Sequence, residues 1–283
     1  MVTLSASTLG APGEDLDRVL GALRRTGVGG IELRLSAGEL ADPAMTRRQR
    51  RELRAAIEDA GVAVTGVASY VRVASDAPDD LVLGALVAAL DLAADLGAPV
   101  VRVFPGAPTE DSEYDQVPVL REDRGEVADR AARRLDAVAG YAEECGVLPA
   151  LETHDSHPTG EMIADVLART SSRVGAIWDL MHPWRVGEPL DQTWALLSPW
   201  VADGRASVQV KDADLPADRT PLPIGQGTLP TGAFADLLVD AGYTGTVTLE
   251  WERAWHRDAL PLEDACASMV HWADSHWPAG CGR

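Results

Sequence analysis

The chain contains 283 residues, of which 46% are hydrophobic and 24% are charged, and its formal net charge is −19 at pH 7. This composition provides material for a large core and argues against a disordered chain. Because nucleic-acid binding normally begins with a basic patch, the negative charge argues against DNA or RNA as a partner.

The sequence also argues against secretion and membrane insertion. Its first ten residues lack a basic segment followed by a cleavable apolar stretch. The longest apolar run, residues 81–90, is about half of the length that spans a bilayer. The three cysteines, Cys145, Cys266 and Cys281, are odd in number and widely spaced. These features favour a reducing cytoplasm and no membrane partner.

A unit recurs along the chain: an amphipathic helix, a glycine that ends it, and a short β-branched run. Glycine adopts the left-handed conformation that ends a helix. The runs are too continuously apolar for half-exposed strands, so we expect parallel strands covered on both faces. In chain order, the expected strands lie within residues 3–9, 27–35, 61–67, 97–104, 146–154, 173–180, 206–212 and 242–252. The clearest expected helices cover residues 15–26, 46–60, 80–96, 126–145 and 262–275.

Eight such units of roughly 35 residues each predict a (β/α)8 TIM barrel that forms a single domain over residues 1–283. A doubly wound open sheet is the main alternative, but no G-x-G-x-x-G motif follows the first strand. Two connections are long, residues 105–125 and 212–231, and both follow expected strands. They should therefore lie on the face where barrels place catalysis, although the first is equally explained as a surface insertion.

Polar residues end four expected strands: Glu152, Asp179, Gln209 and Glu250. A buried carboxylate is costly unless it is paired, hydrogen-bonded or bound to a cation. Each residue alone is explained by a structural hydrogen bond or salt bridge, whereas four oxygen donors on successive strands favour a shared divalent cation. Oxygen-dominated ligation favours Mn²⁺ or Mg²⁺ over a structural zinc, with Mn²⁺ as the first choice and Co²⁺ as a further alternative.

Five segments carry a resemblance to a known family: LETHD from Leu151, WDLMH from Trp178, VQVKDAD from Val208, IGQG from Ile224 and LEWERAWH from Leu249. They resemble the xylose-isomerase-like barrels, a family of sugar phosphate isomerases and epimerases whose relatives include ketose 3-epimerases, hydroxypyruvate isomerases and inosose dehydratases. The resemblance implies that Glu152, Asp179 and Glu250 bind the metal and that His182 faces the substrate. The family has histidine as a metal ligand where this chain has Gln209, a neutral and weaker donor.

The resemblance implies a metal-dependent isomerase or epimerase of a small sugar, keto-sugar or sugar phosphate. Glu152 and Glu250 would exchange a proton with a carbon beside the carbonyl, through a metal-stabilised enediolate. Lys211 would neutralise an oxyanion, and His154 and His182 would contact substrate hydroxyls. A hydride shift, a dehydratase of an inosose- or dehydroshikimate-like substrate, and a barrel that only binds metal or sugar remain alternatives.

Other charged residues have weaker assignments. Glu252 is expected on the last strand, on the same face as Glu250, as a substrate-binding or supporting group. Glu32 is expected inside the barrel near the base of the site. Five arginines would either hold a phosphate or balance local acids, and they are Arg72, Arg102, Arg185, Arg219 and Arg253. Homo-oligomer formation is left open, because related barrels are often dimers or tetramers.

Overall fold

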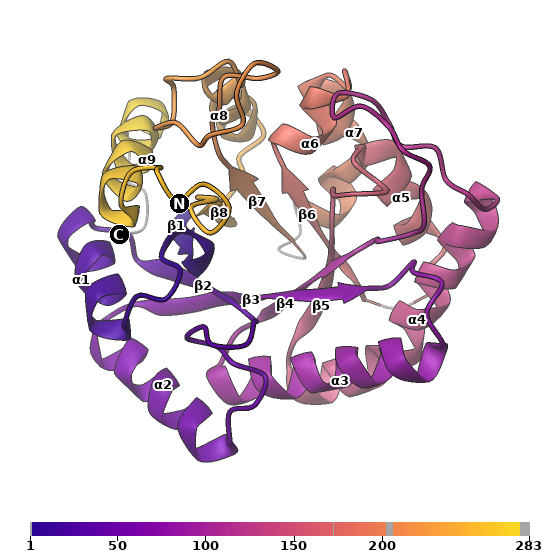
Figure 1. The fold of residues 1–283 in the computed structure, drawn as a ribbon, viewed down its shortest axis with the longest axis horizontal. Coiled ribbons are helices and arrows are strands. Elements are labelled where there is room, and N and C mark those ends of the chain that lie inside the picture. The colour runs from indigo at the N-terminus through magenta and orange to yellow at the C-terminus, as the bar shows by residue number, and fades with distance from the viewer. Residues whose placement is uncertain (1, 172, 202–205, 278–283) are drawn as a thin grey trace.

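The computed structural model describes residues 2–171, 173–201 and 206–277. Eight parallel strands form a closed barrel in the order β1 to β8, and helices surround it (Figure 1). The barrel closes where β8 pairs with β1, with Leu4 opposite Val247. The predicted TIM barrel is confirmed. The strands are β1 Thr3–Ser7, β2 Gly30–Arg34, β3 Ala63–Arg72, β4 Val100–Phe104, β5 Leu148–Glu152, β6 Gly175–Asp179, β7 Ala206–Val210 and β8 Thr246–Leu249.

The five expected helices are present, with ends that differ by one or two residues: α1 Leu16–Thr26, α2 Arg47–Asp59, α3 Asp79–Leu96, α4 Arg124–Cys145 and α9 Leu262–His276. Their ends follow from local chemistry. The Asp15 side chain accepts a hydrogen bond from the Arg18 amide at 2.8 Å and caps α1. Gly97 ends α3 with φ of 72°, a conformation that glycine adopts without a Cβ clash. The remaining helices are η1 Thr8–Gly10, α5 Gly160–Ala168, α6 Met181–Arg185, α7 Leu190–Val201 and α8 Thr231–Asp240.

Three strands end at other residues than their expected segments. The first strand ends at Ser7, because the Ser7 hydroxyl accepts a hydrogen bond from the Leu9 amide and begins η1. The third strand continues to Arg72, five residues beyond residue 67. The last strand ends at Leu249, so Glu252 follows the strand instead of lying on it.

Strand periodicity sends alternate side chains inward and outward. On β6, Trp178 is fully buried among the outer helices, with its ring 4.8 Å from that of Phe234 on α8 and 6.3 Å from that of Trp194 on α7. This packing of Trp178 turns the next residue, Asp179, toward the inside of the barrel. The apolar outer layer therefore fixes the direction of a polar residue in the site.

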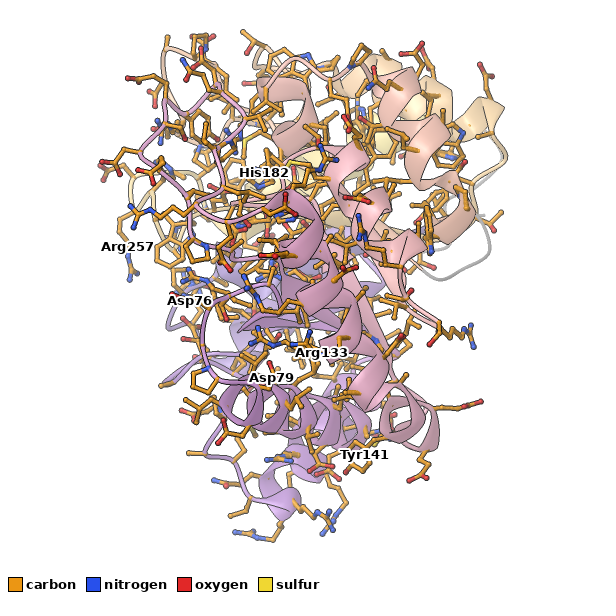
Figure 2. The ribbon with its side chains drawn as sticks, turned by 90° about the vertical axis from the view of Figure 1, so that its right-hand side faces the viewer. Asp76, Asp79, Arg133, Tyr141, His182 and Arg257 are labelled. Atoms are coloured by element: carbon orange, nitrogen blue, oxygen red, sulfur yellow. The ribbon has the colours of Figure 1, made fainter. Side chains whose placement is uncertain are left out.

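A charged clamp joins the turn after β3 to α3 and α4. Asp79, at the start of α3, accepts hydrogen bonds from Arg134 at 2.8 Å and Arg133 at 3.2 Å on α4 (Figure 2). Arg134 is buried and also donates to the carbonyls of Val73 and Ser75. It thereby satisfies backbone groups that would otherwise be buried without partners.

Within the described residues, no helix is both long and apolar enough to cross a membrane. Cys145 and Cys266 are free thiols, and Cys281 lies outside the described residues. The expected reducing compartment stays a prediction.

Candidate active site

Four side chains meet at the carboxyl ends of the last four strands. Asp179 on β6 pairs in register with Gln209 on β7, and Glu152 ends β5. Glu250 directly follows β8, and its amide donates to the Val210 carbonyl at 3.1 Å. All four residues are buried, although Glu250 follows the strand instead of closing it. The four residues that we expected to gather are brought together.

The three carboxylates are close enough to share one cation. Oxygen atoms of Glu152, Asp179 and Glu250 all lie within 4.8 Å of one another. Within the part of the chain that the structure describes, neither oxygen of Glu152 accepts a hydrogen bond, and neither does the amide oxygen of Gln209. Buried polar atoms without partners are rare and costly. The donor set therefore fits a divalent cation held by carboxylate and amide oxygens.

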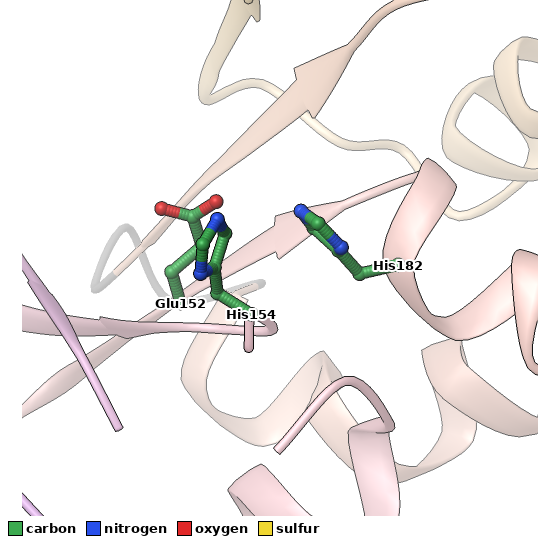
Figure 3. A group of neighbouring side chains, drawn as sticks. All are labelled: Glu152, His154 and His182. Carbon is green, nitrogen blue, oxygen red and sulfur yellow. The ribbon is translucent and has the colours of Figure 1, made fainter. Parts of the chain in front are cut away.

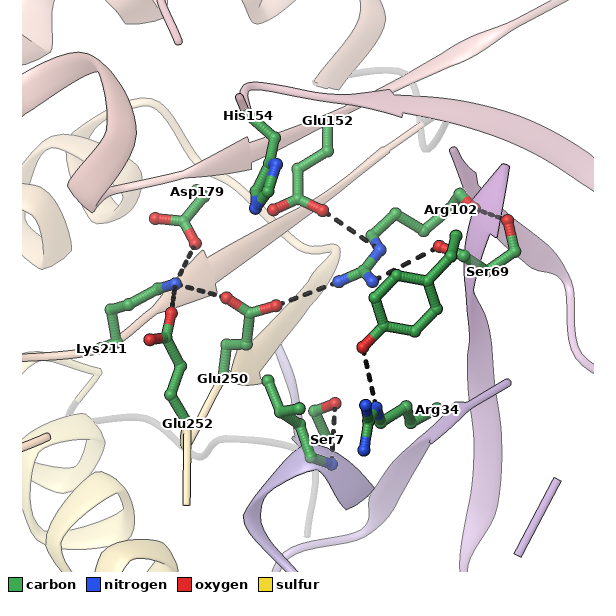
Figure 4. Close-up of polar contacts among 12 residues, drawn as sticks. Ser7, Arg34, Ser69, Arg102, Glu152, His154, Asp179, Lys211, Glu250 and Glu252 are labelled. Carbon is green, nitrogen blue, oxygen red and sulfur yellow. Dashed lines mark hydrogen bonds and ion pairs between the residues drawn. The ribbon is translucent and has the colours of Figure 1, made fainter. Parts of the chain in front are cut away.

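Two cationic side chains already lie among these carboxylates (Figure 4). Arg102, from β4, places Nε 3.2 Å from Glu152 Oε2 and donates from Nη1 to Glu250 Oε1 at 3.0 Å. Lys211 Nζ lies 2.9 Å from Asp179 Oδ2 and donates to Glu252 Oε1 at 2.6 Å and to Glu250 Oε2. Of the two roles that we considered for the five arginines, phosphate binding and balancing of local acids, Arg102 therefore has the second. Sequence reasoning did not place it in the site, although an arginine inside the apolar run VVRVF was a signal.

The cluster contains more acidic than basic side chains. It has two cationic side chains, Arg102 and Lys211, and five carboxyl groups, which gives an excess of three negative charges when all are ionised. The carboxyl groups are those of Glu32, Glu152, Asp179, Glu250 and Glu252. Glu32 is buried at the base of the site, as predicted, and burial raises its pKa. A divalent cation would supply much of the missing positive charge.

The environment separates the two glutamates by pKa. Burial raises the pKa of Glu152 well above its usual range, and Arg102 offsets this only in part. For Glu250, burial also raises the pKa, but Lys211 and Arg102 outweigh it and hold the pKa at about 2. Burial raises the pKa of Asp179 to about 7 against the opposing effect of Lys211. The pKa values of Glu152 and Glu250 are therefore displaced in opposite directions.

His154 and His182 lie beside Glu152 (Figure 3). The His154 ring stacks on Phe104 at 4.0 Å and meets the edge of the His182 ring at 4.6 Å. Arg185 Nε donates to His182 Nδ1 at 3.3 Å, so the neutral ring carries its proton on Nε2. Burial is the main reason that the pKa of His182 lies well below its usual value. His182 is therefore neutral, and its Nε2–H has no partner within the described residues.

Glu152, His154 and His182 form a second group whose ligand atoms lie within 4.8 Å of one another. The hydrogen bond from Arg185 disfavours a metal there, because it occupies Nδ1 of His182 and leaves the proton on Nε2. The three carboxylates offer only oxygen atoms and need no change of tautomer, although Arg102 and Lys211 already form ion pairs with them. They are the better cation site, and the histidines are better placed to contact a ligand.

A cavity of about 370 Å³ opens beside this cluster, and both long connections line it. The first contributes Tyr114, and the second contributes Arg219. Sequence reasoning missed Tyr114, because nothing in an acidic loop sequence marks one aromatic residue as part of a site. A larger cavity of about 550 Å³ lies at the opposite, amino end of the strands, near Thr65 and Thr246, away from the buried carboxylates.

The motif IGQG has a structural explanation. Asp212 Oδ2 accepts hydrogen bonds from the amides of Gly225 at 2.8 Å and Gly227 at 2.9 Å, and Oδ1 accepts one from Leu229 at 3.2 Å. A Cβ on Gly227 would lie 2.2 Å from Asp212 Oδ1. Asp212 thus fixes the loop that follows Lys211.

The comparisons with known proteins agree with this architecture. A family model described as xylose isomerase-like TIM barrel matches residues 20–276. No curated protein matches the sequence.

Solved structures with the same fold include three of interest. L-ribulose 3-epimerase is 18% identical with a TM-score of 0.77, over 100% of both chains. The IolI protein with a bound zinc atom is 16% identical with a TM-score of 0.77, over 98% of this chain and 99% of that one. The probable 3-DHS dehydratase AsbF from Bacillus anthracis is 16% identical with a TM-score of 0.72, over 95% of this chain and 99% of that one. At these identities, the likeness shows the fold.

Proposed function

Because this chain belongs to the xylose isomerase-like TIM barrel family, we propose that it is a single-domain isomerase or epimerase of a small sugar, keto-sugar or sugar phosphate. The observation that carries the proposal is the pair formed by Glu152 and Glu250. The two side chains converge from different strands, and their pKa values are displaced in opposite directions. Two converging carboxyl groups whose pKa values differ can act as acid and base on one carbon.

In this proposal, one glutamate removes a proton from the carbon beside the substrate carbonyl and the other returns a proton. Arg102 holds both glutamates in place, and Lys211 supplies a positive charge near the oxygen that becomes negative. His182 donates from Nε2 to a substrate oxygen, and His154 lies beside it for a second contact. Glu252 keeps Lys211 in position through its 2.6 Å hydrogen bond.

The proposed metal ligands are the three carboxylates and Gln209, which would ligate through its amide oxygen. A bound divalent cation would polarise the substrate carbonyl as a Lewis acid. Mn²⁺ is our first choice, with Mg²⁺ and Co²⁺ as alternatives, because the donors are almost all oxygen atoms. The carboxylates converge, and the Gln209 oxygen is buried without a partner within the described residues.

A dehydratase is the second candidate. It would begin with the same proton removal and then release water, and the fold is shared with the probable dehydratase AsbF. The same Glu152 and Glu250 would serve both reactions. The fate of the substrate hydroxyl therefore decides between them.

Incubation with a panel of ketoses, ketose phosphates and hydroxy keto-acids in D₂O tests the proposal, with products followed by NMR. An isomer or epimer carrying solvent deuterium supports proton transfer, whereas an isomer without deuterium indicates a hydride shift. A product that has lost water indicates a dehydratase. We expect Glu152→Gln and Glu250→Gln each to lower turnover at least about a hundredfold. Absence of product from every panel member, despite metal or sugar binding, would favour a binding protein.

A further inference from the structure

The structure separates the five arginines that the sequence left unresolved, and Arg72 is exposed and does not line the cavity. Arg102 pairs with the buried glutamates, and Arg253 Nη1 lies 2.9 Å from Glu14 Oε1. Arg185 and Arg219 line the cavity, and within residues 2–171, 173–201 and 206–277 neither forms an ion pair with a carboxylate. Two arginines without ion pairs are unexpected at the cavity of a chain that has 44 acidic and 25 basic residues.

Acidic residues that line the same cavity have other partners. Glu252 accepts a hydrogen bond from Lys211. Asp155 accepts from the Gly106 amide at 2.9 Å, and Asp212 accepts from amides of its own loop. These carboxylates form no ion pair with the two arginines. Asp179 and Asp115 act on the pKa of Arg185, but they do so without a direct ion pair.

Arg185 and Arg219 both contact the ring of Tyr114. The guanidinium carbon of Arg185 lies 4.4 Å from the centre of the Tyr114 ring, and that of Arg219 lies 3.7 Å from it. Arg185 also donates from Nη1 to the Tyr114 carbonyl. Burial is the main cause that lowers the pKa of Arg185; Tyr114 and Asp179 oppose this effect, and the charge of Arg219 lowers the pKa further. Two like charges held at one aromatic ring repel each other, and an anion between them would relieve this cost.

Arg185 connects the two-arginine position at Tyr114 to the rest of the candidate site. Arg185 Nε donates to His182 Nδ1, and His182, Lys211 and Glu250 line the cavity together with Arg219. A ligand held by the arginines would therefore reach the reactive side chains. At about 370 Å³, the cavity lies near the lower end of the range of small-molecule sites, which is about 300–1,000 Å³.

We propose that Arg185 and Arg219 form a subsite for an oxyanion group, so that the substrate is a small hydroxycarbonyl phosphate or carboxylate and not a neutral sugar. This inference rests on the proposed function, because it assigns the charged end of the same substrate. Guanidinium groups suit both oxyanions, since their planar donors match phosphate and carboxylate oxygens.

Three compounds with the same hydroxycarbonyl unit test the subsite: dihydroxyacetone, dihydroxyacetone phosphate and hydroxypyruvate. Calorimetry would give their dissociation constants for the wild-type protein. We expect at least one anionic compound to bind about tenfold more tightly than dihydroxyacetone. Whichever anion is preferred identifies the substrate as a phosphate or a carboxylate. Equal affinity for all three compounds would overturn the proposal.

Variants then test the residues. Arg219 is exposed, so Arg219→Gln should fold normally and lower the preference for the anion about tenfold. Arg257→Gln is the matched control, because it removes the same charge from an exposed residue that does not line the cavity. An equal loss in both variants would indicate long-range attraction and would overturn the subsite.

The two proposals can fail separately. Anion preference that depends on Arg219, with no turnover of any panel compound, would keep the subsite and reject the proposed reaction. Turnover of a neutral sugar without anion preference would keep the reaction and reject the subsite.

Discussion

Arg102 Nη1 donates a hydrogen bond of 3.0 Å to Glu250 Oε1, although the two residues lie 148 positions apart in the chain. Arg102 is on β4 and Glu250 follows β8, so the two strands lie on opposite sides of the eight-stranded ring. The same guanidinium is 3.2 Å from Glu152. One cationic side chain therefore spans the barrel and contacts both glutamates of the proposed acid–base pair, where it would compete with a bound metal ion.

Replacement of Arg102 by glutamine should increase metal affinity. The variant removes one of the two cations in the cluster. The carboxylates that it paired with can then attract Mn²⁺, and the repulsion between Arg102 and the metal is lost. Because charges interact strongly in a buried site, we expect Mn²⁺ to bind at least about tenfold more tightly. The metal-free variant should melt at a lower temperature than wild type, and Mn²⁺ should restore its stability because it binds the folded state. Electron paramagnetic resonance titration measures the affinity.

Arg253→Gln serves as the control for that experiment, because Arg253 pairs with Glu14 and not with the clustered carboxylates. Its Mn²⁺ affinity should equal that of wild type. Weaker Mn²⁺ binding by Arg102→Gln would show that Arg102 supports the metal site instead of competing with it.

Gln209→His should also tighten metal binding. The Gln209 amide oxygen has no hydrogen-bond partner within the described residues, and imidazole is a stronger donor than an amide oxygen for Mn²⁺ and Zn²⁺. We expect a gain of about tenfold in affinity, and Gln209→Leu should lose a comparable amount because it removes the donor. Calorimetric titration of the three proteins provides the measurement. Wild-type affinity in Gln209→Leu would exclude Gln209 as a ligand.

Much of the fold was predictable because its signals are local. Glycines after helices, such as Gly97 and Gly146, mark where α3 and α4 end. Apolar runs that end in a carboxylate gave Glu152 and Asp179, and strand periodicity then directs both into the barrel. The short helices α5 to α8 carry weaker patterns, and the sequence analysis did not delimit them.

The interactions inside the site could not be predicted, because they join residues that are distant in sequence. Arg102 lies in one strand, and its partners come from two others. Tyr114 reaches the cavity from a long connection that was equally well explained as a surface insertion. The sequence showed which charges exist, but only the closed barrel shows which of them neutralise one another.

His182 should be neutral at pH 7, with its proton on Nε2. The hydrogen bond from Arg185 to Nδ1 selects this tautomer, and burial lowers the pKa of the ring. Long-range ¹H–¹⁵N correlation spectra of histidine-labelled, metal-free protein report the tautomer, and His182→Asn assigns the signal. In Arg185→Gln the two tautomers should become mixed. A proton on Nδ1, or a doubly protonated ring, would contradict the proposed contact with substrate.

Stability at acid pH should depend on His157. This residue is buried, its Nδ1 lies 2.9 Å from Ser156 Oγ, and burial lowers its pKa to about 4 despite the opposing effect of Asp155. The unfolded chain has an ordinary histidine pKa of about 6.5, so it binds a proton first as the pH falls. The contribution of neutral His157 to the free energy of unfolding is therefore present above about pH 6.5 and is lost as the pH falls toward 4.

Urea unfolding at pH 7 and pH 5 measures this effect. Between these values, His157 should account for a loss of about 2 kcal/mol in the free energy of unfolding. His157→Gln does not titrate, so its stability should fall by about 2 kcal/mol less than that of wild type over the same interval. His271→Gln, at an exposed position on α9, should show the wild-type dependence. If His157→Gln lost as much stability as wild type, protonation of other groups would have to explain the acid sensitivity. The reason is that His157 makes stability depend on pH only through the difference between its pKa in the folded and in the unfolded chain.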